Sequence, residues 1–153
     1  MAMMSIYRTS VATFDVPDHW HDQSIVAFRL PPVPGGGGEA SFVMTKDPGK
    51  GVIPFAVYFE KQANTVSRSL PGYRELKREL LHANERDAAW LEFQFEKDGR
   101  TVHLRQVFFD ADFMAIICTL TATPAEIGYH ENDWRRVMAS LNFDASAAAA
   151  HYP

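Results

Sequence analysis

Ser-Ile-Val-Ala-Phe-Arg-Leu (24–30), Pro-Pro-Val-Pro-Gly-Gly-Gly-Gly (31–38) and Ala-Ser-Phe-Val-Met-Thr-Lys (40–46) form the stretch that decides the fold. The two apolar runs are typical of β-strands, and the Pro/Gly-rich run between them is typical of a flexible connection. Successive strand side chains point to opposite faces, so Val26, Phe28 and Leu30 share one face. Ile25 and Ala27 share the other face.

The second run divides in the same way. Phe42 and Met44 lie on one side, and Ser41, Val43 and Thr45 lie on the other. One face of the strand pair is therefore bulky, as a core requires, whereas the other is small, apolar and dotted with hydroxyl groups. Such a face suits a surface that receives a partner rather than one that faces water, and we look for function there.

Downstream, residues 88–96, 101–109 and 113–121 predict a three-stranded antiparallel meander, with Asp-Gly and Asp-Ala-Asp at its turns. The run 113–121 is apolar on both faces, which predicts a central strand. Upstream, residues 5–9 and 11–16 predict an opening hairpin.

Two helices are expected. Pro54 and the breaker Leu70-Pro71-Gly72 delimit a helix over 54–69, and a second helix is expected at about 132–141, preceded by the capping-box spacing of Thr123 and Glu126. Residues 73–82 contain good helix formers but also suit an extended segment, so both interpretations stay open.

Two glutamines interrupt apolar rows. Gln62 lies within the apolar stripe of the first helix, and Gln106 shares a strand face with Val102, Leu104 and Phe108. A buried amide needs hydrogen-bond partners. A neighbouring group or water could supply them, and so could a bound polypeptide.

The 153-residue chain predicts one domain over residues 1–143 and a flexible tail over 144–153. The formal net charge is −4, with acids and bases interspersed, so nucleic acid is not an expected partner. The N-terminus lacks the pattern of a signal peptide, and no run is long enough to span a membrane. We therefore expect a cytoplasmic protein without stable membrane insertion.

Catalysis and cofactors are not expected. The single Cys118 lies in an apolar run, where it acts as a small buried hydrophobe, and His19-x-His21 lacks the further ligands that zinc needs. The glycines at 35–38 are not followed by Gly-Lys-Ser/Thr, so they form no phosphate cradle. With no catalytic motif, an enzyme is not predicted.

Together these elements predict an α+β fold, in which an antiparallel, curved sheet of about six strands carries its helices on one face. The second face, with residues such as Leu104 and Phe108, would then lack a cover. At about 25 cal/mol per Å² of apolar area, exposing several such side chains forgoes several kcal/mol, comparable with a domain's stability. A partner chain, an apolar ligand or a second copy is therefore expected to cover it.

The chain resembles the Eag chaperones, effector-associated proteins of bacterial type VI secretion systems with a DcrB-like, PsbP-like fold. The motifs that carry the resemblance, across about residues 5–143, are Tyr7-Arg8, Pro17-Asp18-x-Trp20-x-Asp22-Gln23-Ser24-Ile25, Glu39-Ala40-Ser41-Phe42-Val43, Leu70-Pro71-Gly72-Tyr73, Leu104-Arg105-Gln106-Val107-Phe108 and Thr119-Leu120-Thr121-x-Thr123-Pro124. The Pro/Gly loop at 31–38 and the Ala-rich tail depart from the family pattern.

The resemblance implies a cytoplasmic homodimer that shields the N-terminal transmembrane helices of a cognate effector, often of the PAAR or Rhs type, until loading. It places the client-binding residues at Ile25, Ala27, Ser41, Val43, Thr45, Gln62 and Gln106. No ATP site is visible, so release is expected to come from a competing partner or from the membrane. Two alternatives stay open: a carrier of a lipid or other small apolar ligand, and a dimer that uses the apolar face only for self-association.

Overall fold

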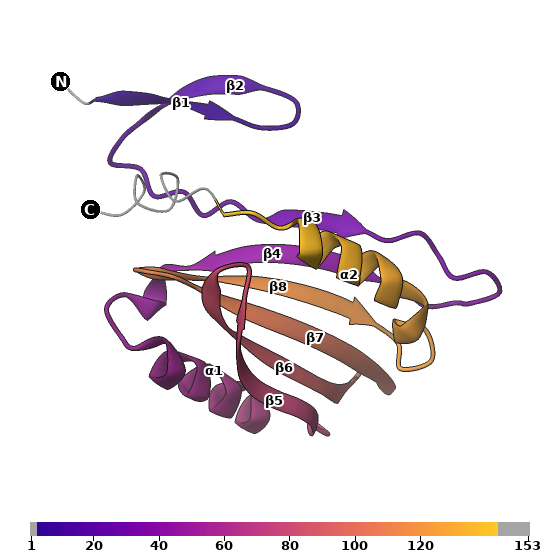
Figure 1. Ribbon diagram of the computed structural model, residues 1–153. Helices are drawn as coiled ribbons and strands as arrows, with labels where there is room; N and C mark the ends of the chain where they lie inside the picture. Colours follow the sequence, from indigo (N-terminus) through magenta and orange to yellow (C-terminus); the bar gives the residue numbers. More distant parts are fainter. Residues whose placement is uncertain (1–2, 144–153) are drawn as a thin grey trace.

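The computed structural model describes residues 3–143, which form a curved six-stranded sheet, two α-helices and a separate β-hairpin (Figure 1). The strands are β1 (Met4–Arg8), β2 (Thr13–Pro17), β3 (Val26–Arg29), β4 (Ser41–Asp47), β5 (Arg74–Ala83), β6 (Arg86–Lys97), β7 (Arg100–Ala111) and β8 (Met114–Ala122). The helices are α1 (Phe55–Ser69), α2 (Glu131–Ser140) and the short 3-10 helices η1 (Pro48–Lys50) and η2 (Ile127–His130). The predicted α+β class and the antiparallel sheet of about six strands are confirmed.

The six strands follow the order β3-β4-β8-β7-β6-β5, and each neighbouring pair is antiparallel. β8 lies between β4 and β7, so the strand predicted to be central is central. Its position follows from its composition, because a strand that is apolar on both faces is stable only where both faces are covered.

Tight turns join the last four strands. Asp98 and Gly99 adopt positive φ values of 53° and 75° between β6 and β7, and Asp112 adopts 65° between β7 and β8. Glycine and short polar residues tolerate this left-handed region best. Asn84 and Glu85 form the corresponding turn between β5 and β6. Residues 73–82, for which both helix and strand were possible, are therefore extended and belong largely to β5.

The two outer strands of the sheet differ in character. β5 carries exposed charged side chains, among them Glu75, Lys77 and Glu79, and its register with β6 shifts between Glu75 and Lys77. β3 is short and every one of its residues is exposed, including Val26 (43%) and Phe28 (59%). Of the bulky face expected for residues 24–30, Val26 and Phe28 are thus exposed on this edge strand, whereas Leu30 is half-buried and packs against the cluster that includes Trp134.

The two α-helices lie on opposite faces of the sheet, so the expectation that they share one face is wrong. α1 packs Phe59 and Ala63 against a cluster that includes Phe93 and Phe108, whereas α2 packs Trp134 against a cluster that includes Val107. Val107 and Phe108 are adjacent in β7 and point to opposite faces. The central strands are apolar on both sides, so each face requires its own helix.

The capping-box spacing before the last helix also forms a different contact. Glu126 precedes η2 at the N-cap position, but its side chain makes no capping bond; its Oε1 accepts a hydrogen bond from the Gly38 N–H at 3.3 Å. Gly36 and Gly38 lie so close to this carboxylate that a Cβ at either position would approach it within 2.3 and 2.7 Å, respectively. The glycines of the loop therefore allow close packing against the turn that precedes α2.

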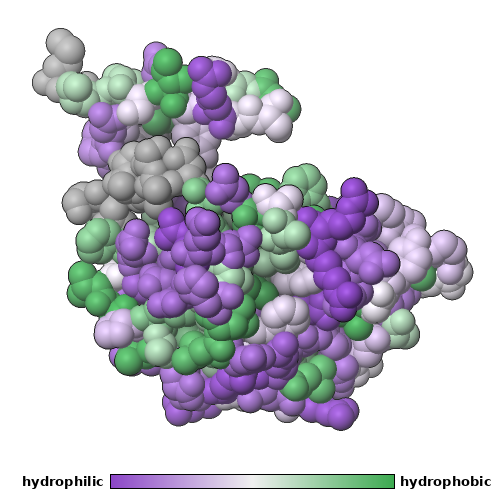
Figure 2. Space-filling model, in the orientation of Figure 1, coloured by the Kyte–Doolittle hydropathy of each residue, from purple (hydrophilic) through white to green (hydrophobic). Residues whose placement is uncertain are grey.

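The β1–β2 hairpin projects from the body as a separate lobe with hydrophobic side chains on its surface (Figures 1 and 2). Ile6, Phe14 and Trp20 are exposed by 65, 48 and 62%. An ion pair of 2.9 Å between Asp22 and Lys46 connects the segment after the hairpin to β4. Burial alone would raise the pKa of Asp22, but the bonds from Lys46 and Ser24 lower it to about 2. The predicted tail over 144–153 lies outside the described residues.

Candidate functional site

The candidate site is the part of the α1-bearing sheet face that α1 leaves uncovered. Cross-strand neighbours share a face, and the register aligns Ala27, Val43, Thr119 and Gln106 across four strands. We call this surface the groove floor; it consists of Ala27, Ser41, Val43, Thr45, Leu104, Gln106, Thr119 and Thr121. Ala27 is exposed and the other members are half-buried, so the floor is partly open in the isolated chain.

α1 covers only the neighbouring part of this face. Phe108 is 2% exposed beneath the helix, and Leu104 packs at the margin of the same cluster. The expectation that Phe108 lacks a cover is therefore wrong, because α1 lies over it, whereas Leu104 is covered only in part. The uncovered surface is narrower than the sequence suggested and is centred on β4 and β8.

One flank of α1 borders the groove floor. Arg78 of β5 donates hydrogen bonds to Glu60 at 2.9 Å and to Asn64 at 3.2 Å, so this flank faces β5. Tyr58 donates its hydroxyl proton to Asp47 of β4 at 2.5 Å, so the opposite flank faces β4. α1 therefore forms a wall along the floor.

Two polar side chains distinguish this wall. Burial and the Asp47 carboxylate raise the pKa of Tyr58 far above its usual range, so its hydroxyl stays a hydrogen-bond donor. Gln62 is half-buried and follows Tyr58 by one helical turn, which places it on the same flank. The amide of Gln62 can therefore reach a molecule that lies on the floor.

Gln106 carries the most informative atom of the floor. Its Nε2 donates to Thr119 Oγ1 across a long 3.4 Å, while its buried Oε1 has no hydrogen-bond partner among the described residues. An unpaired buried acceptor costs about 1–3 kcal/mol. The Gln106 side chain therefore has an acceptor left over within the partly buried floor, which a bound donor could satisfy.

A cavity of about 850 Å³ continues the floor at one end. Phe95, Val102 and Leu104 supply its apolar lining, while charged residues stand around them. The charged lining residues are Glu39, Lys97, Asp98 and Arg100. The surface thus changes from small and hydroxyl-bearing in its middle to apolar with a charged rim at this end.

The structure brings most of the predicted client-binding residues together. Ala27, Ser41, Val43, Thr45 and Gln106 share the floor, and Gln62 lies on the adjoining flank of α1. Ile25 precedes β3 and is 64% exposed, so it stands beyond the regular ladder.

Sequence reasoning missed Thr119, Thr121 and Tyr58. Thr119 and Thr121 alternate with the buried Cys118 and Leu120, and this period of two would have placed their hydroxyls on the floor. Tyr58 has no comparable signal, since its role depends on its contact with Asp47 in another element.

The opposite face carries a buried ionic network. His103 bonds Glu92 at 2.6 Å, and Arg105 bonds Glu92 at 3.1 Å and also pairs with Glu131 of α2. Burial alone would raise the pKa of Glu92, but hydrogen bonds from His103, Arg105 and Trp90 lower it. This network attaches α2 to the sheet and lies away from the groove floor.

Features of a reactive or metal site are not found within residues 3–143. No group of three or more His, Cys, Asp or Glu residues is placed to hold a metal ion there. Cys118 is fully buried, and burial raises the pKa of its thiol to about 12, which disfavours the reactive thiolate. No described helix is both long and apolar enough to cross a membrane.

The sequence matches the DcrB family over residues 12–140, and the chain belongs to this family. It is 39% identical to the curated protein Effector EagT6 of Pseudomonas aeruginosa over 138 residues, covering 90% of this chain and 95% of the relative. The resemblance to the Eag proteins predicted from the motifs is thereby confirmed.

A solved structure has the same fold. The crystal structure of PA94 from Pseudomonas aeruginosa, a protein of unknown function, superposes with a TM-score of 0.82 at 38% sequence identity. The match covers 92% of this chain and 97% of that chain.

Proposed function

We propose that this protein is a type VI secretion chaperone that shields an apolar, N-terminal transmembrane helix of a cognate effector on the groove floor before loading. The relationship to Effector EagT6 supports an effector as the partner. The protein acts by binding alone, without a chemical step. A spanning helix of about 20 apolar residues cannot persist uncovered in the cytoplasm, so a protein cover is required there.

The observation that carries this proposal is the unpaired Oε1 of Gln106 on an otherwise small and apolar floor. Small residues let two backbones approach closely, which is how helices associate inside membranes. Ser41, Val43 and Thr119 provide such a surface, and the amides of Gln62 and Gln106 offer hydrogen bonds to small polar groups of the client. The floor thus resembles a neighbouring membrane helix in its chemistry.

The projecting hairpin supports a homodimer. Phe14 and Trp20 line an open cavity of about 420 Å³ beneath the hairpin, and Phe28 of β3 is also exposed. A two-stranded hairpin is marginally stable on its own. A second copy related by two-fold symmetry would bury the same apolar patch on both chains.

The cavity of about 850 Å³ also supports a second candidate, a carrier of a lipid or other small apolar ligand. Ligand sites of about 300–1,000 Å³ are usual in proteins. A lipid extracted from the purified protein at one per chain would favour the carrier over the chaperone.

Val43→Gln tests the chaperone function by placing an uncompensated amide in the middle of the floor. An unpaired amide costs about 1–3 kcal/mol, so capture of a co-expressed transmembrane segment is expected to fall about 5- to 150-fold. Val57→Gln is the matched control, since Val57 is 47% exposed and does not belong to the buried side of α1. Equal capture by both variants would count against the groove floor as the binding surface.

A further inference from the structure

On β4, β7 and β8, the three inner strands beneath the groove, charged floor-side positions lie only at the two ends. On the floor side of β4, β7 and β8, the charged positions are Asp47, Arg100 and Asp110. Between Arg100 and Asp110 the side chains of β7 that share this face are Val102, Leu104, Gln106 and Phe108. These three strands are therefore uncharged along the floor and charged where it stops, and on the edge strand β3 the only floor-side charge is Arg29 beside Ser41.

This uncharged length, which α1 covers at Phe108, is close to that of one membrane-spanning helix. Arg100 and Asp110 are ten positions apart on β7, which corresponds to about 33 Å at ~3.3 Å per residue. A helix of about 20 residues is ~30 Å long, close to the hydrocarbon thickness of a bilayer. A segment of this length would place its two polar ends beside the charged positions.

The two ends carry opposite charge. Lys97 and Arg100 are cross-strand neighbours on the floor side, and no ion pair joins either to a described carboxylate. Arg29 is the neighbour of Ser41 and lies in the row of Leu104, so it adds positive charge on the same side of the floor's middle, four positions from Arg100 along β7. Like charges placed directly opposite each other destabilise a sheet, so this pair would gain from a nearby negative group. Glu39 and Asp98 also line the cavity there but lie outside the strands.

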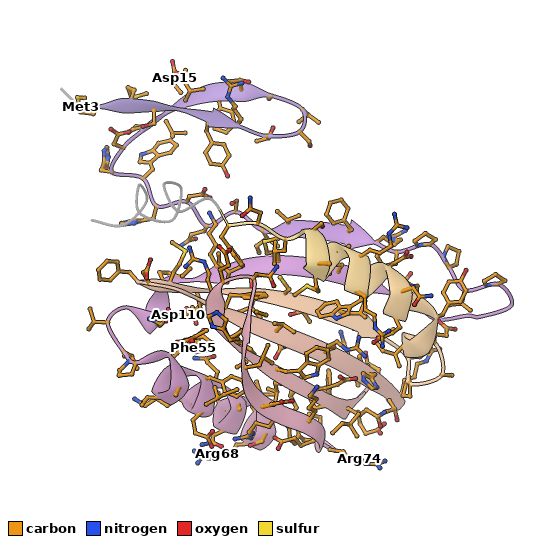
Figure 3. All side chains as sticks on the ribbon, viewed as in Figure 1. Met3, Asp15, Phe55, Arg68, Arg74 and Asp110 are labelled. Carbon is orange, nitrogen blue, oxygen red and sulfur yellow. The ribbon has the colours of Figure 1, made fainter. Side chains whose placement is uncertain are left out.

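At the other end the floor-side charges are acidic. Asp47 accepts the Tyr58 hydroxyl, and Asp110 pairs with the buried Lys50 at 3.2 Å. α1 runs from this end, where Tyr58 in its first turn contacts Asp47, toward the cationic one, and Figure 3 labels Phe55 and Arg68 near its two ends. The Glu96 N–H donates to Pro71 O at 2.8 Å, which fixes the end of α1 beside the cationic pair.

We propose that the groove binds a single apolar helix of about 20 residues in one direction, with its C-terminal end at Lys97 and Arg100 and its N-terminal end near Asp47. The C-terminus of a helix exposes unpaired carbonyls and carries a partial negative charge of about half an electron, whereas the N-terminus is positive. The cationic end of the groove complements the negative C-terminus of the helix, and the acidic end complements its positive N-terminus. This inference rests on the proposed function and adds the length and direction of the client.

Directional cross-linking tests the inference. Val102→Cys marks the cationic end and Thr45→Cys marks the acidic end, while the native Cys118 is fully buried and does not compete. The probe is an Ala/Leu segment of about 20 residues, roughly 30 Å as a helix, fused to a soluble carrier and bearing one cysteine at its N- or C-terminal end. Oxidation is expected to join the C-terminal cysteine to position 102 and the N-terminal cysteine to position 45.

Charge reversal provides the second measurement. Lys97→Glu/Arg100→Glu is expected to weaken probe binding about tenfold and to abolish the end preference, because two favourable end charges become unfavourable. Lys61→Glu/Arg68→Glu changes the net charge equally on the exposed surface of α1 and is the control. A segment of about 14 residues, roughly 21 Å long, should bind more weakly because it cannot reach both ends.

The outcomes separate the two proposals. The reverse pairing, equal pairing of both probe ends, or a preference that survives the Lys97→Glu/Arg100→Glu change would overturn the direction while leaving the groove as the binding surface. An absence of cross-links at both positions would instead remove the proposed function. Cross-links from the C-terminal cysteine to position 102 and from the N-terminal cysteine to position 45, with this preference lost only in Lys97→Glu/Arg100→Glu, would support both the groove and the direction.

Discussion

Replacing Gln106 with methionine is expected to stabilise the free protein and to weaken its binding of an apolar helix. The buried Oε1 has no partner, at a cost of about 1–3 kcal/mol, and the long 3.4 Å bond from Nε2 to Thr119 returns less than about 1 kcal/mol. Methionine has nearly the same shape and carries no unpaired amide. The net gain is about 1–2 kcal/mol in the free energy of unfolding.

Thermal and urea unfolding measure this gain. For a domain of about 150 residues, it corresponds to a rise in Tm of roughly 2–8 °C. Titration with the Ala/Leu probe segment should show a loss of affinity of about two- to tenfold, the value of one neutral hydrogen bond of ~0.5–1.5 kcal/mol. The change would thus raise stability and lower function together.

Gln94→Met is the matched control on the opposite face. The Gln94 amide bonds the ring of His103 at 3.2 Å, so its loss should lower stability by about 1 kcal/mol and leave probe binding unchanged. If Gln106→Met destabilises the free protein, the amide oxygen has a partner there and the reasoning fails. If stability rises while affinity stays constant, the client does not bind Gln106.

Three further changes test the wall, the ionic network and the dimer. Tyr58→Phe removes the donor to Asp47 and should lower the free energy of unfolding by about 1–2 kcal/mol; unchanged urea unfolding would show that this contact does not hold α1. Glu92→Gln should cost about 1.5–3 kcal/mol near neutral pH because His103 and Arg105 lose the carboxylate that both bond, and Arg105 keeps only Glu131. In the wild-type fold the pKa of Glu92 is lowered from 4.5, so the extra stability of the wild type over the variant should vanish as the pH falls through that lowered value. A pH-independent difference in stability would contradict this account. Phe28→Ser should leave the chain folded but shift its mass in sedimentation from two chains to one, and a monomeric wild type would refute the dimer.

The elements with clear periodicity could be predicted from the sequence. Apolar rows at spacing two identified β6, β7 and β8, and breakers delimited α1. β5 was ambiguous because it is an edge strand whose charged side chains face solvent on both sides, which leaves no alternation to detect. The placement of the helices on opposite faces was missed because two apolar sheet faces do not reveal which helix covers which.

The candidate site was predictable where it depends on strand parity. Ser41, Val43 and Thr45 follow from alternation alone, and Gln106 was conspicuous as an amide within an apolar row. Contacts between distant segments could not be predicted. The bond from the Gly38 N–H to Glu126 joins residues far apart in sequence, and it shapes a loop that composition describes only as flexible.

The unequal margins of the sheet limit how the molecule can assemble. An outer strand offers unpaired backbone groups to any matching strand, and charged side chains and bulges discourage such addition. β5 has both deterrents, whereas β3 presents Val26, Ala27 and Phe28 with a single charge at Arg29. If two copies pair β3 with β3, each chain uses the one edge strand that favours strand addition. Assembly then stops at a closed dimer and does not continue into a filament.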